Sequence, residues 1–342
     1  MLRFGYRVEE LQSDEDSEPG PKDPLVGRRF GGYQVFKKVG QSAVADTYWA
    51  DRIGSHGRRT PITLEIIREE VAHAEGFSNV FAEEARISAL PHHPNLARVC
   101  DHGVVDGRFY LANESSAGRR LDLMLQGLRR LGVHPGIRFS VGLVLDIART
   151  LGPSRARREQ GRPAEVVHGD IRPSNITVVH RAKAQLLGLG LARLARAMGW
   201  PAAIDGPRIY LAPEQITGGA VDARTDVFSL GIILWELLTG EPLFYGHSPP
   251  DALWSVLHGD VFPPSLLVPE LPPELDRIVL TALSPDPARR YPSASKLACE
   301  LSIVKFAPQL RDAFVPARRV ALAPRSEPKI LLFPRRRFEL LN

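Results

Sequence analysis

The sequence has little cysteine and no long apolar run. Cys100 and Cys299 lie far apart without metal-ligand spacing, which argues against a disulfide framework or a cysteine metal site and predicts free thiols in a reducing compartment. The longest apolar stretch, residues 227–238, contains Glu236 and is too short to cross a bilayer. The first residues also lack the apolar core of a signal peptide. We therefore expect a cytoplasmic protein without a membrane span.

The chain also lacks net charge over most of its length. All 342 residues together are formally +5, and residues 318–342 alone carry seven Lys or Arg and two Glu, a surplus of +5. Everything before residue 318 is therefore neutral, which argues against a nucleic-acid-binding groove. We expect residues 306–342 to form a basic tail containing Pro and Arg. Residues 1–25, with an acidic cluster at 14–18, are expected to be a disordered lead.

Between these ends, the apolar pattern predicts one domain of the α+β class at residues 26–305. Residues 30–114 predict a small lobe rich in strands, because short apolar runs with β-type residues alternate with turns. Residues 118–305 predict a larger helical lobe. The expected strands of the small lobe include 33–39, 45–50 and 62–67, and its helix is expected at 78–90.

Residues 167–175, Val-His-Gly-Asp-Ile-Arg-Pro-Ser-Asn, resemble the catalytic loop H-R-D-x-K-x-x-N of protein kinases. The resemblance places Asp170 at the catalytic base and Asn175 at a metal ligand. Arg172 stands at the lysine position two residues after the base, a change that keeps the charge but not the geometry.

Further segments follow in the order and spacing of the eukaryotic-like serine/threonine kinases of bacteria, so the resemblance implies a two-lobed protein-kinase-like fold. It places Glu84 at the glutamate of the αC helix, Asn113 near the gatekeeper position and Glu114 at the hinge between the lobes. The matching segments are 81–85 with 93–96, 109–114, 210–214, 226–231 and 286–291.

Four of the matched residues have roles in the family that do not depend on catalysis. The resemblance implies a buried ion pair between Glu214 and Arg290, which would tie the activation segment to the late helices. It also implies that His168 and Asp226 hold the catalytic loop from within the large lobe. Asp170 and Asn175 can be explained in the same way, as polar residues that hold the loop's backbone.

The phosphate-binding positions depart from the family. The glycine-rich loop should read G-x-G-x-x-G, because its backbone must approach phosphates without an intervening Cβ. Here residues 40–45 keep only Gly40, with Ser42 and Ala45 at the other two glycine positions.

Two charges of the nucleotide site are also changed. The third-strand lysine is replaced by Glu65, which the resemblance places near Glu84. Two carboxylates about 4 Å apart repel by ~4 kcal/mol at an effective dielectric of about 20, so we expect them to part, share a proton or capture a cation. The aspartate of D-F-G, which holds the metal on the phosphates, is replaced by Gly188. These changes predict that no metal ion is held in the usual way.

The activation switch is missing at both ends. The arginine of H-R-D, which receives a phosphate from the activation loop, is replaced by Gly169. Residues 188–209 contain no Ser, Thr or Tyr, and Pro207 stands at the position that resembles the family's P+1 threonine. We therefore expect no switching by phosphorylation of this loop.

Three functions remain open. The sequence favours a pseudokinase, a binding, scaffold or regulatory module in bacterial signalling that uses no cofactor and binds a protein partner such as an active kinase or its substrate. The first alternative is a weak or unconventional serine/threonine kinase that uses ATP with Mg²⁺ and Asp170 as base. The second is a nucleotide-sensing module that binds without phosphoryl transfer.

Overall fold

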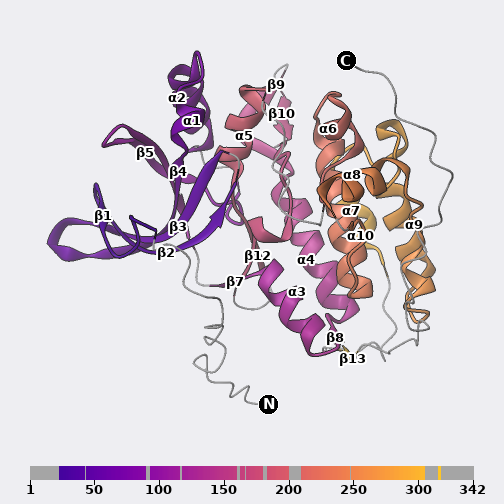
Figure 1. Cartoon of the computed structure of the whole chain (residues 1–342). Coiled ribbons are helices and arrows are strands. Elements are labelled where there is room, and N and C mark those ends of the chain that lie inside the picture. The colour runs from indigo at the N-terminus through magenta and orange to yellow at the C-terminus, as the bar shows by residue number, and fades with distance from the viewer. Residues whose placement is uncertain are drawn as a thin grey trace.

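A computed structural model describes residues 23–42, 44–89, 93–115, 118–159, 162–165, 167–179, 183–199, 209–246, 248–304 and 315–316. Within these ranges no helix is long and apolar enough to cross a membrane. Residues 1–22 of the expected acidic lead and most of the basic tail lie outside the described residues. Residues 23–25, which were expected to be disordered, are ordered: the Tyr48 hydroxyl donates to Asp23, and Leu25 packs on the small-lobe core. Figure 1 shows the strands of the small lobe on one side and the helices of the large lobe on the other.

The small lobe is built on a six-stranded antiparallel sheet with the order β1-β2-β3-β4-β6-β5. The three strands expected from the sequence are present, and each is longer than predicted. Tyr33, Val35, Tyr48, Ile62 and Leu64 are buried on the sheet's core face. The bounds are β1 Arg29–Phe30, β2 Tyr33–Gln41, β3 Ala45–Ile53, β4 Arg59–Ile67, β5 Val99–Val105 and β6 Arg108–Glu114.

Two helices and a 3-10 turn complete the small lobe. Helix α2 buries Phe77, Phe81 and Ala85 against β5 and β6, which accounts for the apolar spacing seen in the sequence. It begins after Gly76 in the left-handed conformation. The bounds are α1 Glu69–Ala72, α2 Phe77–Ser88 and the 3-10 turn Ser55–Gly57.

The large lobe is helical around one central helix, α7, Ala223–Thr239. This helix is capped by the Asp222 side chain at its start and by Gly240 in the left-handed conformation at its end. Its residues from Thr225 to Leu238 are all buried, as the run of apolar residues predicts. The surrounding helices are α3 Leu121–Arg130, α4 Ile137–Thr150, α5 Leu189–Ala197, α6 Pro213–Thr217, α8 Pro249–His258, α9 Pro273–Ala282 and α10 Ala294–Ser302.

A small three-stranded sheet stands where the two lobes meet, with the order β12-β11-β7. It carries the segment after the hinge, the strand that follows the catalytic loop and the strand that leads to Gly188, so it positions the candidate site. Its strands are β7 Gly118–Arg120, β11 Ile176–Val179 and β12 Lys183–Leu186. The remaining pairs join β9 Pro153–Glu159 with β10 Arg162–Glu165 and β8 Val133–His134 with β13 Val315–Pro316.

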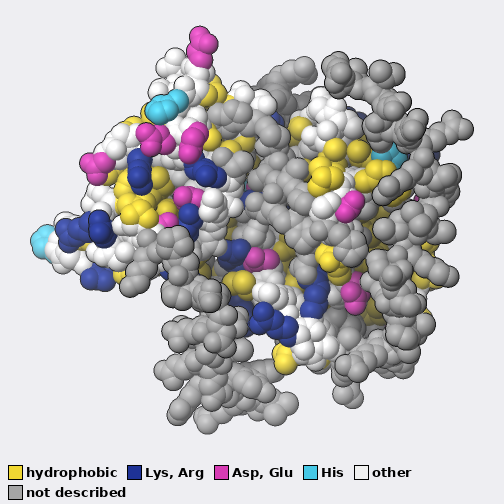
Figure 2. Space-filling model, viewed as in Figure 1, with side chains coloured by type: hydrophobic (Ala, Val, Ile, Leu, Met, Phe, Trp, Pro, Cys, Tyr) yellow, Lys and Arg dark blue, Asp and Glu magenta, His cyan; other side chains and the backbone are white. Residues whose placement is uncertain are grey.

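The surface in Figure 2 mixes charges of both signs. Over the small lobe, Lys and Arg side chains lie among Asp and Glu side chains and do not form one continuous basic stripe. Several ion pairs cross this lobe, such as Lys38 with Asp46 at 3.0 Å. The described surface on this face therefore offers no basic groove of the kind that follows a nucleic-acid backbone.

Candidate functional site

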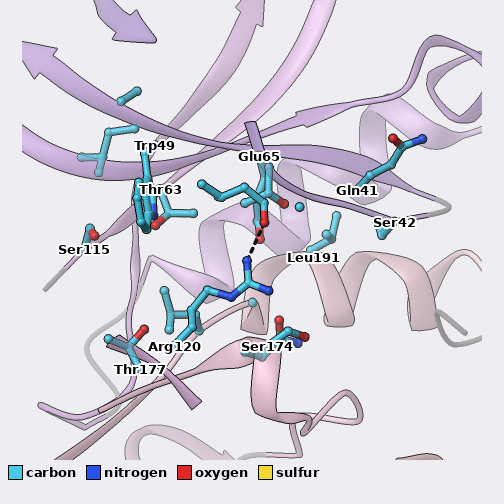
Figure 3. Close-up of a pocket in the computed structure, with 18 of the residues that line it drawn as sticks. Gln41, Ser42, Trp49, Thr63, Glu65, Ser115, Arg120, Ser174, Thr177 and Leu191 are labelled. Atoms are coloured by element: carbon cyan, nitrogen blue, oxygen red, sulfur yellow. Dashed lines mark hydrogen bonds between the residues drawn. The ribbon is translucent and has the colours of Figure 1, made fainter. Parts of the chain in front are cut away.

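A cavity of about 420 Å³ lies between the lobes. Its lining comes from β2, β3 and β4 of the small lobe and from β7, the catalytic loop, β11 and the start of α5 in the large lobe (Figure 3). Seven residues expected at a nucleotide site line it: Gly40, Ser42, Glu65, Asp170, Arg172, Asn175 and Gly188. Ala45, Glu84 and Glu114, which were expected there as well, are not among the lining residues.

Glu65 is buried on the small-lobe wall of the cavity. Its side chain comes from β4 and accepts a hydrogen bond at 3.0 Å from the amide of Asn113 on β6, the neighbouring strand. Burial raises the pKa of Glu65 to about 7, although the Asn113 bond partly opposes the rise. At the lysine position, the cavity is therefore lined by a buried carboxyl group.

Glu84 is not among the charged groups that act on Glu65, so the two carboxylates part, which is one of the outcomes expected from the sequence. Glu84 instead forms an ion pair with Arg193 of α5, with 2.7 Å between Oε2 and Nε. Both side chains are largely buried, because α5 packs directly on α2. The αC glutamate is thus neutralised by a cation from the segment after Gly188, and Glu65 is stabilised separately by Asn113.

Glu114 also has a different place from that expected of a nucleotide contact. Its side chain lies outside the cavity and pairs with Arg98, while its backbone N–H donates to the Arg98 carbonyl at 3.0 Å. The carboxylate therefore fixes the strand before the hinge and does not face a ligand.

Hydrogen bonds of the Ser42 side chain hold the segment at the glycine-rich-loop position, residues 40–45. The Ser42 hydroxyl accepts hydrogen bonds from the backbone N–H groups of Val44 and Ala45, at 3.2 and 3.1 Å, and donates to the Ala45 carbonyl at 3.1 Å. In the family these N–H groups would point to phosphates. Here a side chain already satisfies two of them.

The catalytic loop is held from below by Asp226. Its two oxygens accept the backbone N–H groups of His168 and Gly169, each at 2.7 Å, and burial raises the pKa of Asp226 to about 7. His168 is fully buried, its Nε2 lies 2.9 Å from the Leu187 carbonyl, and burial lowers its pKa to about 4. These contacts are structural and place the loop against α7 without a ligand.

Asp170, Arg172 and Asn175 face the cavity together. The Asn175 amide donates to the Asp170 carboxylate at 3.0 Å and to its backbone carbonyl at 2.9 Å. Arg172 Nε lies 3.4 Å from the other Asp170 oxygen. The carboxylate at the base position is therefore engaged on both oxygens.

Gly188 begins α5 in the left-handed conformation, with φ of +84°. A Cβ added here would lie 3.4 Å from Nδ2 and 3.6 Å from Oδ1 of Asn175. A carboxylate at this position would therefore stand beside Asn175, as a metal pair requires, but glycine supplies no ligand.

Because Gly169 has no side chain, Arg196 of α5 can pack against the catalytic loop at this point. Its φ is +79°, and an added Cβ would lie 2.9 Å from Nη1 of Arg196 on α5. Arg196 also donates to the Val167 carbonyl at 3.3 Å. Arg196 of α5 thus occupies the space that the arginine of H-R-D would enter if residue 169 had a side chain. Pro207 lies outside the described residues.

The expected pair of Glu214 and Arg290 is present. Arg290 donates to both Glu214 oxygens at 2.8 Å, and Thr225 donates to one of them at 2.8 Å. Burial works against the charge, but the hydrogen bonds from Arg290 and Thr225 keep the pKa of Glu214 below its usual value. The pair joins α6 to the segment before α10.

Arg120 is the cavity residue that sequence reasoning missed. It ends β7 directly after the hinge, and its side chain crosses the cavity to donate to the Val39 carbonyl on β2 (Figure 3). The available signal was an arginine paired with Asp122 two residues later, just where the large lobe begins. Family motifs do not single out this position, so the resemblance did not point to it.

These residues differ at three points from those that hold ATP with Mg²⁺ in the family. Where the family has a lysine there is a buried carboxyl group, two N–H groups of the loop donate to Ser42, and Gly188 offers no metal ligand. Among the described residues, no three His, Cys, Asp or Glu gather closely enough to hold a metal ion.

Comparison with known proteins agrees with this architecture. A family model described as protein kinase domain matches residues 33–300. MasK of Myxococcus xanthus, a tyrosine-protein kinase, is 30% identical over 278 residues, which cover 80% of this chain and 43% of MasK. PknB of Mycolicibacterium smegmatis, a serine/threonine-protein kinase, is 29% identical over 277 residues, which cover 79% and 42%. The chain thus spans less than half the length of these relatives.

The likeness extends to solved structures. The kinase domain of Mycobacterium tuberculosis PknI superposes with a TM-score of 0.57 at 22% identity, covering 81% of this chain and 97% of that domain. The shared architecture is a curled β-sheet lobe joined to a helical lobe. The chain therefore belongs to the protein kinase domain family, with relatives among the eukaryotic-like kinases of bacteria.

Proposed function

We propose that this kinase domain is a pseudokinase, a cytoplasmic binding or regulatory module for a protein partner such as an active kinase or its substrate. The observation that carries the proposal is the Glu65–Asn113 hydrogen bond in the cavity wall. Phosphoryl transfer depends on positive charge placed against the phosphates. A carboxyl group at that place opposes a triphosphate in its charged form and offers no positive charge when protonated.

The rest of the domain supports this reading because its own side chains hold the segments that frame the cavity. Asp226 fixes the catalytic loop, Arg193 fixes α2, and Arg196 packs where a phosphate-receiving arginine would start. A module of this kind presents a constant surface to a partner. In this proposal the cavity carries out no phosphoryl transfer, because Gly188 supplies no metal ligand and Glu65 no positive charge.

One observation favours the enzyme alternative. Asp170 and Asn175 stand side by side in the cavity, 3.0 Å apart, and Arg172 supplies a cation beside them. A weak kinase with ATP in another pose would use these three residues. The cavity of about 420 Å³ also leaves room for the nucleotide-sensing alternative.

Radiolabel transfer from ATP with Mg²⁺ tests the proposal. We expect the purified domain to label itself and a general protein substrate no more than its Asp170→Asn variant does. That variant is the matched control because Asn keeps the side chain's size and removes the base. Labelling by the wild type that disappears in Asp170→Asn would establish the enzyme alternative.

A further inference from the structure

Arg120 links the two lobes through the cavity. Its Nη1 donates to the Val39 carbonyl on β2, while Nε and Nη2 donate to the two oxygens of Asp122 at 3.0 and 2.6 Å. All three guanidinium nitrogens are therefore engaged, and Asp122 offsets the charge. The side chain acts as a neutralised bridge and not as an open cation for an anionic ligand.

Both ends of this bridge are set by local structure. Val39 lies at an irregularity in the β2–β3 ladder, where the pairing shifts between Lys38 and Gly40, so its carbonyl is left for a partner outside the ladder. At the other end, the backbone of Arg120 on β7 lies opposite Thr177 of β11 in the antiparallel ladder of the large lobe. Asp122 lies in the first turn of α3, where a helix favours a negative charge.

The bridge stands in the middle of the cavity. Figure 3 shows the Arg120 guanidinium with Trp49 and Thr63 on one side and Gln41 and Ser42 on the other. All of these residues line the same cavity. A ligand that reaches from the hinge to the glycine-rich loop would therefore lie against Arg120.

We propose that Arg120 is a built-in strap that holds the glycine-rich loop against the large lobe in place of a bound nucleotide. The proposal rests on the proposed function, in which the cavity works without nucleotide. In an active kinase the ligand itself connects the loop to the large lobe. Here the side chain of Arg120, directly after the hinge, makes the connection and holds the lobes together.

Amide hydrogen exchange of the full chain tests the strap. In Arg120→Ala, amides of residues 38–47 should exchange about tenfold faster than in the wild type, because a charge-assisted contact between the lobes is lost. Arg119→Ala is the matched control, since Arg119 precedes Arg120 on the same strand and is exposed, and it should leave these amides unchanged. Melting temperatures verify that each variant is folded.

Asp122→Asn serves as a second, milder variant if Arg120→Ala does not fold. It keeps Arg120 and removes its anchor, so the same amides should exchange several-fold faster. Equal exchange of residues 38–47 in the wild type and in whichever of these two variants folds would overturn the strap. This outcome is distinct from failure of the proposed function, which is decided by radiolabel transfer in the wild type.

Discussion

At the scale of single residues, Glu65 explains how the cavity wall accommodates a wrong charge. A buried carboxylate without partners is very unfavourable, and proteins respond by protonating it or by supplying hydrogen bonds. Both responses are present: Asn113 donates a hydrogen bond, and burial moves the pKa of Glu65 to about 7. Asn113, near the gatekeeper position, thus serves as the hydrogen-bond donor to Glu65.

The shifted pKa predicts a pH-dependent gain from Glu65→Gln. The pKa of Glu65 is raised from 4.5 in the unfolded chain to about 7 in the fold, so its contribution to stability is full below pH 4.5 and is lost as the pH rises through about 7. The variant's gain in unfolding free energy should therefore grow over this window and level off above pH 7, at roughly 3 kcal/mol or less.

Urea unfolding of both proteins between pH 5 and 8.5 measures this gain. Asp226 and His168 titrate in both, so only the difference between variant and wild type reports Glu65. Glu114→Gln is the matched control, because this side chain is half exposed and lies outside the cavity. A difference that stays flat across the pH range would show that Glu65 keeps an ordinary pKa in the fold.

At the scale of elements, α5 contacts both α2 and the catalytic loop through arginine side chains. Two arginines one turn apart serve opposite sides: Arg193 pairs with Glu84 on α2, and Arg196 packs on the catalytic loop. This segment was expected to be an activation loop, and its helix was not predicted from the sequence. Its signal was an apolar face formed by Leu191, Leu194 and Met198, at helical spacing.

Removing Arg193 should therefore release α2. Arg193→Ala leaves Glu84 largely buried without its cation, so we expect the free energy of local opening of α2 to fall by about 1–3 kcal/mol, seen as faster amide exchange in residues 77–88. Arg86→Ala is the matched control, because Arg86 pairs with Glu83 on the exposed side of the same helix. Similar exchange in the two variants would mean that α5 does not hold α2.

At the scale of the whole molecule, the ion pair of Glu214 and Arg290 secures the large lobe. Arg290→Ala would leave the Glu214 carboxylate buried beside Thr225 alone, and breaking such a pair costs about 3–5 kcal/mol. We expect this loss in the free energy of unfolding in urea. Arg289→Ala is the matched control, since Arg289 is mostly exposed and should change little. Equal stability of the two variants would contradict the predicted role.

The fold was predictable from sequence to a greater depth than the site. Apolar periodicity located the lobes and the buried helix α7, because packing constrains these residues to a repeating pattern. The pair of Glu214 and Arg290 was implied only by the resemblance to the kinase family. The partners of Glu65 and Glu84 were not predictable, since each depends on how α2, α5 and β6 meet in space. Arg120 was missed for the same reason: its partner Val39 is distant in the chain.

The size of the cavity bears on how a nucleotide could be excluded from it. Bulky side chains could close such a cleft, but here a volume of about 420 Å³ is present. Charge and the missing ligand at Gly188 therefore remain as the main barriers. Glu65→Lys with Gly188→Asp addresses both, and the left-handed backbone at Gly188 accepts aspartate at a cost of order 1 kcal/mol. The new lysine would face Asp170, whose charge acts on Glu65.

A thermal-shift titration with ATP, with and without Mg²⁺, tests most directly whether the cavity works without a metal-bound nucleotide. A ligand that binds the folded state must raise the melting temperature by mass action. We predict no Mg²⁺-dependent rise for the wild type and a clear one for the folded Glu65→Lys, Gly188→Asp double variant. A rise of several degrees in the wild type that requires Mg²⁺ would contradict the account.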